Sequence, residues 1–342
     1  MAMVKADAYG HGMVECARVF NECGAAAFGV AEVIEGVRLR QAGLKQPIFI
    51  LAGILPALIP EIFEYKLTPV LVDDQLIASL AKEAEQRQTR LSVHLKVDAG
   101  MGRQGCLGAE VCDVVAKISQ AKCLRLAGIM AHYPMADDPV CGNSKQVLAA
   151  FRSISAAVMK EYPEITRHIA NSGGIFSIDG SSLDMVRPGI SLYGYGASPA
   201  GSHQVKGLQL QPVMSFVSRV IQVRQLPSGH GLGYGHLFTT TRKTRLAVLP
   251  VGYEDGYLRA LSNRASVLIH GLRAPVVGRI SMNLTLVDIS DIENVKSGDE
   301  VVLLGRQGSD RITADEIAGW MDTISYEVLC LFGHCNRREY VA

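Results

Sequence analysis

The sequence has almost no excess of charge of either sign. Its 342 residues include 34 Lys and Arg against 33 Asp and Glu, which gives a formal net charge of +1. A chain of this kind has no global field that would hold DNA, RNA or an anionic membrane surface. We therefore expect no nucleic-acid partner and no membrane contact from this chain. Any charged ligand must be bound by a few local groups.

Paired cysteines and long apolar runs are also missing. The eight cysteines form no CxxC pair, which argues against zinc-ribbon and thioredoxin-like sites, and no metal site is expected. Cys330 and His334 stand four residues apart, but no second pair accompanies them. The longest apolar stretch, residues 47–60, is shorter than the ~20 residues that a bilayer requires, and no signal peptide follows Met1. Reduced thiols and the lack of such segments predict a cytoplasmic chain.

Residues 1–205 alternate short apolar runs with stretches of helical period, which is typical of βα units. The eight strand-like runs are Ala2–Lys5, Ala26–Ala31, Ile48–Ala52, Thr68–Val72, Leu91–Val97, Leu124–Ala131, Arg167–Ala170 and Asp184–Arg187. The first run is not followed by the GxGxxG turn of a dinucleotide-binding sheet. The pattern therefore predicts an α/β fold, a (β/α)8 barrel of the TIM type.

Residues 206–342 predict a second domain that is mostly β. Its strand-like runs, separated by turn residues, are 213–226, 244–253, 265–271, 274–280, 284–289 and 300–305. A single short helix is expected at residues 314–322. The total length exceeds the ~250 to 300 residues at which single hydrophobic cores stop growing, and the change of pattern favours two domains over one.

Polar residues stand where the predicted barrel strands end, at the rim where barrel active sites lie. They are Lys5, Lys96, Asp98, Arg103, His132, Asn171, Ser172 and Arg187. A partly desolvated lysine can form a Schiff base with a carbonyl compound. The glycine-containing turns at residues 171–174 and 187–190 offer backbone N–H groups to a phosphate. Together these features indicate pyridoxal 5'-phosphate as the cofactor.

Seven segments in order then resemble the alanine racemase family across essentially the whole chain. They are Val4-Lys5-Ala6-Asp7-Ala8-Tyr9-Gly10-His11-Gly12, Lys96-Val97-Asp98-Ala99-Gly100-Met101-Gly102-Arg103, Asn171-Ser172, Val186-Arg187-Pro188-Gly189-Ile190, Gly233-Tyr234-Gly235, Gly252-Tyr253-Glu254-Asp255-Gly256-Tyr257 and Gly278-Arg279-Ile280-Ser281-Met282. The resemblance implies a barrel followed by a β domain and a head-to-tail homodimer. It also implies interconversion of the L and D forms of a small amino acid that is used in cell-wall peptides.

The resemblance also assigns roles to individual residues. It implies that Lys5 holds the cofactor and acts as one base, and that Tyr234 of the partner subunit acts as the other. The remaining cofactor ligands that it implies are Tyr9, His132, Asn171, Ser172, Arg187, Gly189 and Ile190. Arg103 and the N–H of Met282 would hold the substrate carboxylate, and Lys96 matches a position that is carbamylated in many relatives. Tyr253 either lines the entrance or packs at a domain joint.

The sequence departs from the family at His334, where alanine racemases usually carry a tyrosine that narrows the substrate pocket. In this respect it resembles the serine/alanine racemase domains of vancomycin-resistance type. We therefore expect that L-serine and D-serine are substrates as well as, or in place of, alanine. Because the first strand begins at residue 2, we also expect that a preceding segment has been lost, and that the parent protein is membrane-anchored as in those relatives.

Two other functions remain open at this stage. A barrel amino-acid decarboxylase is opposed by Arg187, because relatives of that kind place a carboxylate opposite the pyridine nitrogen. A carrier of pyridoxal phosphate without turnover is opposed by the β domain that supplies Tyr234, because such carriers lack that domain.

Overall fold

The computed structural model describes residues 1–138, 143–197, 204–205 and 208–341. The chain divides into two compact units. The first holds Met1–Ala8 and most of the chain from Gly12 to Leu210, and the second holds Tyr9–His11 and the chain from Gln211 onward. A stretch of three residues inside the first sequence motif therefore belongs to the second unit.

The first unit is built on parallel strands in the order β1-β2-β3-β4-β5-β7-β8. The strands are β1 (Ala2–Met3), β2 (Phe28–Val30), β3 (Ile48–Ile50), β4 (Thr68–Leu71), β5 (Leu91–Asp98), β7 (Leu124–Met130) and β8 (Thr166–His168), and the short β6 (Cys106–Leu107) pairs with β5. Their apolar residues are almost fully buried, as expected for parallel strands that are covered on both faces. The predicted α/β barrel is confirmed.

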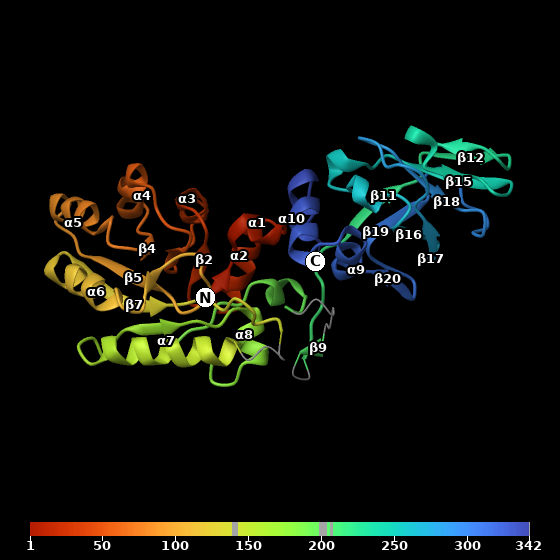
Figure 1. The fold of residues 1–342 in the computed structure, drawn as a ribbon. Coiled ribbons are helices and arrows are strands. Elements are labelled where there is room, and N and C mark those ends of the chain that lie inside the picture. The colour runs from red at the N-terminus through yellow and green to blue at the C-terminus, as the bar shows by residue number, and fades with distance from the viewer. Residues whose placement is uncertain (139–142, 198–203, 206–207, 342) are drawn as a thin grey trace. The chain divides into compact units, whose positions relative to one another are not determined.

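Helices follow the strands and surround the sheet (Figure 1). They are α2 (Met13–Glu22), α3 (Val33–Gln41), α4 (Ile59–Glu64), α5 (Ile77–Gln86), α6 (Val111–Gln120), α7 (Asn143–Met159) and α8 (Ser172–Ser177). In α6 the buried residues Val111, Val114, Val115 and Ile118 recur at helical spacing, so one face of the helix packs on the sheet. This alternation brings the carboxyl ends of all the strands to one edge.

The eighth predicted strand, residues 184–187, is not a regular strand. It makes isolated hydrogen bonds to its neighbours: the N–H of Arg187 donates to the carbonyl of Ala170 at 2.8 Å, and the N–H of Met3 donates to the carbonyl of Pro188 at 3.1 Å. Pro188 has no N–H with which to continue a ladder. The segment nevertheless lies between β8 and β1, so it closes the barrel and fixes the position of Arg187.

The second unit is mostly β, as predicted. One sheet has the order β11-β19-β16-β17 and another the order β12-β15-β18. The strands are β11 (Phe216–Arg219), β12 (Gln222–Leu226), β15 (Thr244–Leu249), β16 (Ser266–Ile269), β17 (Leu272–Pro275), β18 (Thr285–Asp288) and β19 (Glu300–Gln307), with β20 (Asp310–Ile312) paired to β19. A short hairpin of β13 (Gly231–Leu232) and β14 (Phe238–Thr239) carries the loop that contains Tyr234.

The predicted helix at residues 314–322 is present as α9 (Ala314–Met321). The expectation of a single helix is wrong, because α10 (Ser325–Cys335) follows it. Gly333 lies inside α10, and an internal glycine weakens the sequence signal of a helix. Burial of Val328, Leu329 and Phe332 stabilises α10 through packing instead.

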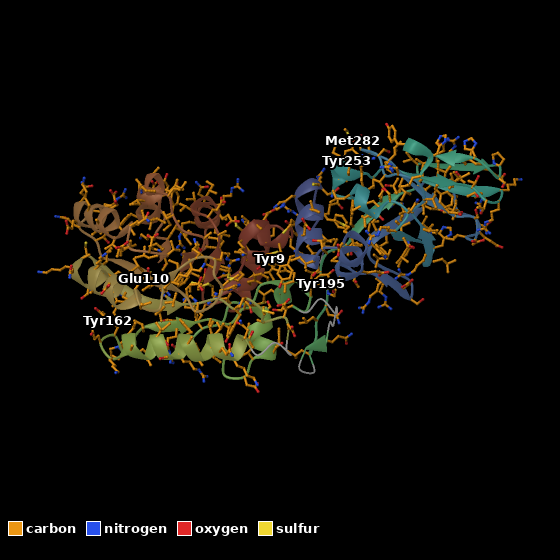
Figure 2. The ribbon with its side chains drawn as sticks, in the orientation of Figure 1. Tyr9, Glu110, Tyr162, Tyr195, Tyr253 and Met282 are labelled. Carbon is orange, nitrogen blue, oxygen red and sulfur yellow. The ribbon has the colours of Figure 1, made fainter. Side chains whose placement is uncertain are left out.

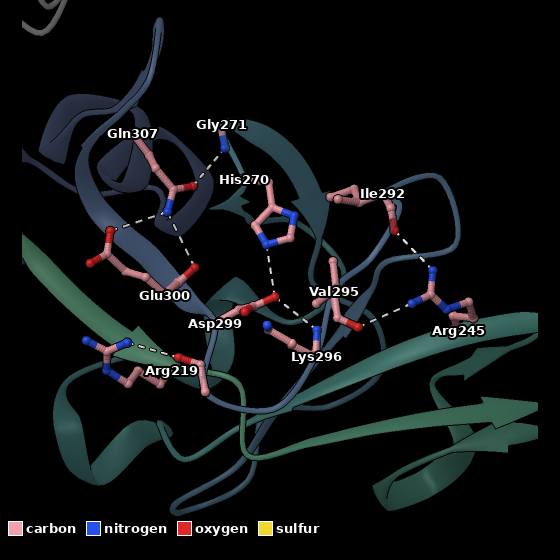
Figure 3. Close-up of polar contacts among 11 residues, drawn as sticks. Arg219, Arg245, His270, Gly271, Ile292, Val295, Lys296, Asp299, Glu300 and Gln307 are labelled. Atoms are coloured by element: carbon pink, nitrogen blue, oxygen red, sulfur yellow. Dashed lines mark hydrogen bonds and ion pairs between the residues drawn. The ribbon is translucent and has the colours of Figure 1, made fainter.

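The loop between β18 and β19 is held by Arg245 of β15, by His270 in the turn between β16 and β17, and by a contact within the loop (Figure 3). Arg245 donates to the carbonyls of Ile292 and Val295 at 3.1 and 3.3 Å. The Asp299 carboxylate is hydrogen-bonded to His270 at 2.9 Å and accepts from the N–H of Lys296 at the same distance. These contacts fix the loop to the rest of the second unit.

Candidate active site

Lys5 lies two residues after the end of β1, at the first position of a left-handed helical turn, α1 (Lys5–Tyr9). Ala6, Asp7, Ala8 and Tyr9 all have φ between 52° and 56°. For L-residues this conformation costs about 1–2 kcal/mol each, so four such residues cost on the order of 4–8 kcal/mol. A strained turn persists only where its surroundings hold it, and turns of this kind cluster at functional sites.

Several hydrogen bonds hold the strand and the turn around Lys5. The buried Tyr193 hydroxyl donates to the carbonyl of Met3 at 2.7 Å. Asp7 Oδ1 accepts from the N–H of Met13 at 2.8 Å, which ties the turn to the start of α2. The lysine itself is exposed, so its amine can be reached by a ligand.

Arg187 is a buried cation of the first unit, with 3% of its surface exposed. Its Nη2 donates to the carbonyls of Ala131 and Ile169 at 2.7 and 3.1 Å. Burial lowers its pKa to about 10, so it stays charged at neutral pH. Among the described residues no carboxylate is paired with it, and its Nε–H has no acceptor there. A buried cation in this state can bind an acceptor or an anion that enters the site.

Two buried histidines continue the hydrogen bonding behind Arg187. Nη1 of Arg187 donates to Nδ1 of His168 at 2.9 Å, and Nε2 of His168 lies 2.9 Å from Nδ1 of His94. A guanidinium only donates, so Nδ1 of His168 must be an acceptor and its proton must be on Nε2. Nδ1 of His94 then accepts in turn. Both rings are therefore neutral.

The pKa values agree with this assignment. Burial, and then Arg125 and Arg187, lower the pKa of His94 to about 4. Burial and the adjacent Arg187 hold the pKa of His168 well below its ordinary value. His132, whose Nδ1 is 3.3 Å from Nη2 of Arg187, has its pKa lowered by burial and by Arg187 as well. Arg187 is thus backed by neutral imidazoles.

Lys96, on β5, is buried and hydrogen-bonded to Gln104. Its Nζ donates to Oε1 of Gln104 at 2.7 Å, and Nε2 of Gln104 donates to the carbonyl of Ala52 at 2.8 Å. Burial and the nearby Arg103, Arg187 and Lys5 lower the pKa of Lys96 to about 8. A sizeable fraction of this amine is therefore neutral, and so nucleophilic, just above neutral pH.

The loop that carries Arg103 is organised by one carboxylate. Asp98 Oδ1 accepts from the N–H groups of Gly100, Met101 and Gly102 at 2.8 to 3.1 Å, and Oδ2 accepts from the N–H of Arg103 at 3.0 Å. These backbone hydrogen bonds lower the pKa of Asp98 despite the opposing effect of burial, which is the largest single influence. The Arg103 side chain is exposed and has no partner within the described ranges.

Ser172 links the two turns that were predicted to bind phosphate. Its Oγ accepts from the N–H of Gly189 at 2.9 Å and from the N–H of Ser191 at 3.3 Å, and it lies 3.0 Å from the Ser191 hydroxyl. Asn171 caps α8 by accepting from the N–H of Gly174 at 2.9 Å. The neighbouring Ile190 is fully buried. Backbone N–H groups and hydroxyls therefore converge at Ser172.

The second unit places Tyr234, Tyr253 and Met282 on one pocket of about 520 Å³. Figure 2 shows Tyr253 and Met282 close together on this unit. The Tyr234 side chain is 70% exposed and Met282 is 52% exposed, which is unusual for residues of this size. The lack of a side chain at Gly252 lets its backbone approach the Met282 backbone closely, because a Cβ on Gly252 would lie 2.2 Å from the Met282 carbonyl oxygen.

Tyr9 and His334 belong to the second unit through α10. A Cβ on Gly333 would lie 1.9 Å from the carbonyl oxygen of Gly10, and a Cβ on Gly10 would lie 2.2 Å from the carbonyl oxygen of Leu329. Residues 9–11 thus pack directly on the α10 backbone. Burial raises the pKa of Tyr9, with smaller effects of Tyr326 and Cys330, so its hydroxyl stays protonated and able to donate. His334 is exposed on the next position of the helix.

The structure therefore distributes the predicted site residues over both units. Electrostatic coupling links Lys5, Lys96, Arg103 and Arg187 to His132, so these residues of the first unit lie near one another. Tyr9, Tyr234, Tyr253, Met282 and His334 are carried by the second unit.

Sequence reasoning missed four residues that support this site. They are Glu35, His94, Gln104 and His168. His94 stands two residues before Lys96, so it points to the same side of β5, and this spacing was the one available signal. Glu35 lies on a helix 29 residues after Ala6, and nothing in the sequence pairs them.

Comparison with known proteins places this geometry in a family. Residues 1–197 match the family model for the alanine racemase N-terminal domain, and residues 213–340 match the one for its C-terminal domain. An alanine racemase of Thermodesulfovibrio yellowstonii is 42% identical over 341 residues, which is 100% of this chain and 89% of that protein. A second, from Syntrophobacter fumaroxidans, is 40% identical over 99% of this chain and 90% of that protein.

Solved structures give the same result. An alanine racemase of Streptomyces coelicolor A3(2) has a TM-score of 0.92 and 34% identity, and covers 100% of this chain and 91% of its own. One from Bartonella henselae with covalently bound pyridoxal phosphate has a TM-score of 0.89 and 29% identity, and covers 99% of this chain and 92% of its own. No helix in the described part of this chain is long and apolar enough to cross a membrane.

Proposed function

Because the chain belongs to the alanine racemase family, it is a pyridoxal-phosphate-dependent amino-acid racemase, and we propose that its two bases are Lys5 and Tyr234 of the partner subunit. Two observations together support this proposal. Lys5 begins a strained turn, and Arg187 is buried without an acidic partner among the described residues.

The residues present fit this cofactor. The buried Arg187 guanidinium, with an Nε–H that has no acceptor in the described part of the chain, suits a neutral heteroaromatic nitrogen, because it can only donate. The Ser172 hydroxyl, whose oxygen accepts from the N–H groups of Gly189 and Ser191, can donate to a phosphate. The protonated Tyr9 hydroxyl of the second unit is a further donor of this kind. We propose that Asn171 and Ile190 shape this phosphate site and that His132 supports Arg187.

When bound, pyridoxal phosphate supplies an electron sink for the electron pair left when Cα loses its proton. Arg187 would hold the ring nitrogen by donating a hydrogen bond without giving up a proton, which would keep that sink weak. The neutral His168 accepts from Nη1 of Arg187 and is itself hydrogen-bonded to the neutral His94, which supports this position of the guanidinium. A weak sink favours prompt return of the proton to Cα.

Racemisation requires that the proton leave one face of Cα and that another arrive on the opposite face, so it needs two bases on opposite sides. Lys5 takes or gives the proton on one face through Nζ. Tyr234 of the partner subunit does so on the other through its phenolic oxygen. Its 70% exposure on the surface of the second unit supports this role, because a catalytic phenol must be covered by another surface. We therefore propose a homodimer with shared active sites.

We propose that Arg103 and the N–H of Met282 hold the substrate carboxylate, with Tyr253 at the entrance. The exposed guanidinium of Arg103, on a loop held by Asp98, supports this role. We also propose that Lys96 is carbamylated: its neutral amine adds to the carbon of CO₂ and loses one proton, which leaves an anion beside Arg103. The low pKa of Lys96, about 8, supports this reaction.

We further propose that the enzyme accepts serine as well as alanine. A pocket wall without a hydrogen-bonding group distinguishes an added hydroxyl by only ~10²-fold, so a modest change of lining is enough to admit serine. His334, which replaces the usual tyrosine, provides an imidazole that can hydrogen-bond such a hydroxyl. The D-amino acids formed would serve cell-wall peptides. We propose a cytoplasmic location, which the lack of a disulfide among the seven described cysteines supports.

The test uses purified holoenzyme in deuterated water. Wild type should exchange the α-proton of both alanine enantiomers. Lys5→Ala should lose the visible absorbance of the bound cofactor, whereas Tyr234→Phe should keep that absorbance and lose racemisation. Normal racemisation by Tyr234→Phe would show that the two-base assignment is wrong.

A further inference from the structure

We propose that Glu35 is a positioning residue that holds the left-handed turn of Lys5 in place. This inference rests on the role proposed above for Lys5. Glu35 lies in the first turn of α3 and is half-buried.

The Glu35 carboxylate joins three pieces of backbone. Its Oε1 accepts from the N–H of Ala6 at 2.6 Å. Its Oε2 accepts from the N–H of Ala31 at 2.8 Å and from the N–H of Glu32 at 3.0 Å. Ala31 directly follows β2, which pairs with β1, and Glu32 is the N-cap of α3. One side chain therefore ties the turn after β1 to the end of the neighbouring strand.

The hydrogen bond to Ala6 has a specific consequence for Lys5. The N–H of Ala6 belongs to the peptide group that begins with the Lys5 carbonyl, so fixing it fixes the plane of that peptide. Ala6 is also the first residue with a positive φ, at 52°. The backbone hydrogen bonds from Ala8 to Val4 and from Gly12 to Asp7 lie within the same segment, and the one from Met13 to Asp7 Oδ1 ties the turn to α2.

Both carboxylate oxygens are needed for this arrangement. A glutamine at this position has one acceptor oxygen and one NH₂ group. The NH₂ group would face a backbone N–H, and two donors cannot form a hydrogen bond. Glu35→Gln can therefore keep either the Ala6 contact or the contacts to Ala31 and Glu32, but not both. Removing the charge also weakens each bond that remains, because hydrogen bonds to ionised groups are roughly twice as strong as neutral ones.

The experiment compares wild type, Glu35→Gln, Glu35→Ala and the control Glu32→Ala. The control changes the N-cap of α3 and leaves the Glu35 to Ala6 contact in place. Hydrogen exchange in the peptide that covers residues 5–9 is measured first, without added cofactor. We expect exchange at least tenfold faster in Glu35→Gln than in wild type, still faster in Glu35→Ala, and unchanged in the control.

The second measurement is titration of the apoenzymes with pyridoxal 5'-phosphate, followed by borohydride reduction and peptide mass spectrometry. We expect at least tenfold weaker binding in both Glu35 variants, less label on Lys5, and a shifted pH titration of the visible band. If Glu35→Ala does not fold, Glu35→Gln carries the test.

Distinct results separate failure of this inference from failure of the proposed function. Equal exchange, affinity and pH titration in Glu35→Gln and wild type would overturn the positioning role. So would changes no larger than those of Glu32→Ala, which would make Glu35 a helix cap only. If wild type carries no label on Lys5, the proposed function fails, and the exchange measurement still decides whether Glu35 holds the turn.

Discussion

Replacement of His94 tests whether the buried histidines behind Arg187 are neutral. The folded pKa of His94 is about 4, against an ordinary value of 6.5. Between these values the unfolded chain binds a proton that the folded chain does not, so stability falls as pH falls through this window and is regained as pH rises. From the two values, His94 alone should cost about 2.4 kcal/mol between pH 7 and pH 4.5.

His94→Gln keeps an acceptor for Nε2 of His168 and removes the titration. We therefore expect the loss of stability between pH 7 and 4.5 to be smaller by about 2 kcal/mol in this variant than in wild type. Urea unfolding followed by far-UV circular dichroism, at one protein concentration and saturating cofactor, measures the difference. His230→Gln, which removes an exposed histidine of the second unit, is the control and should behave as wild type.

The reasoning would be refuted if His94→Gln lost as much stability as wild type over this range. A nitrogen-detected NMR spectrum offers a direct check of the tautomers. It should show His168 and His94 neutral at pH 7, each with its proton on Nε2. A protonated His168 would mean that Nη1 of Arg187 does not donate to it as described.

Three further predictions concern other parts of the site. His334→Tyr should lower kcat/KM for L-serine relative to L-alanine by at least tenfold, and an unchanged ratio would rule out His334 as the specificity residue. Incubation with ¹³C-bicarbonate should produce a carbamate NMR signal that is absent from Lys96→Ala, and a wild-type spectrum without it would leave Lys96 as a free amine. Gly333→Ala should destabilise the second unit by about 1–3 kcal/mol, because its Cβ would lie 1.9 Å from the Gly10 carbonyl oxygen. Gly319→Ala is the control and should not destabilise the unit, because the space around Gly319 is open. Unfolding monitored by the fluorescence of the single tryptophan, Trp320, measures the stability of both variants.

The strands of the first unit could be predicted because buried parallel strands are nearly continuous apolar runs. The segment at residues 184–187 shows the limit of that signal. It has the composition of a strand and takes the place of one, but Pro188 prevents a regular ladder. Helix α10 was not predicted, because its sequence contains an internal glycine. Tertiary packing stabilises this helix in spite of the glycine.

The chemistry-bearing residues could be proposed from their positions at strand ends, but the residues that hold them could not. No sequence rule predicts a left-handed turn over Ala6-Asp7-Ala8-Tyr9, because such residues strongly disfavour it. The turn exists through contacts with residues far away in the sequence, such as Glu35. His168 likewise reaches Arg187 only because β8 and the closing segment are neighbours in the barrel.

The interlocking of Gly10 with Gly333 bears on how this enzyme can be recombined. Residues 9–11 belong to the first sequence motif but pack on α10. A chimera joined near residue 205 would therefore take α10 from one parent and the loop at residues 9–11 from the other. A chimera that exchanges only the C-terminal half would join an α10 backbone to a foreign loop. An exchange that preserves this fit therefore has to transfer residues 9–11 together with α10.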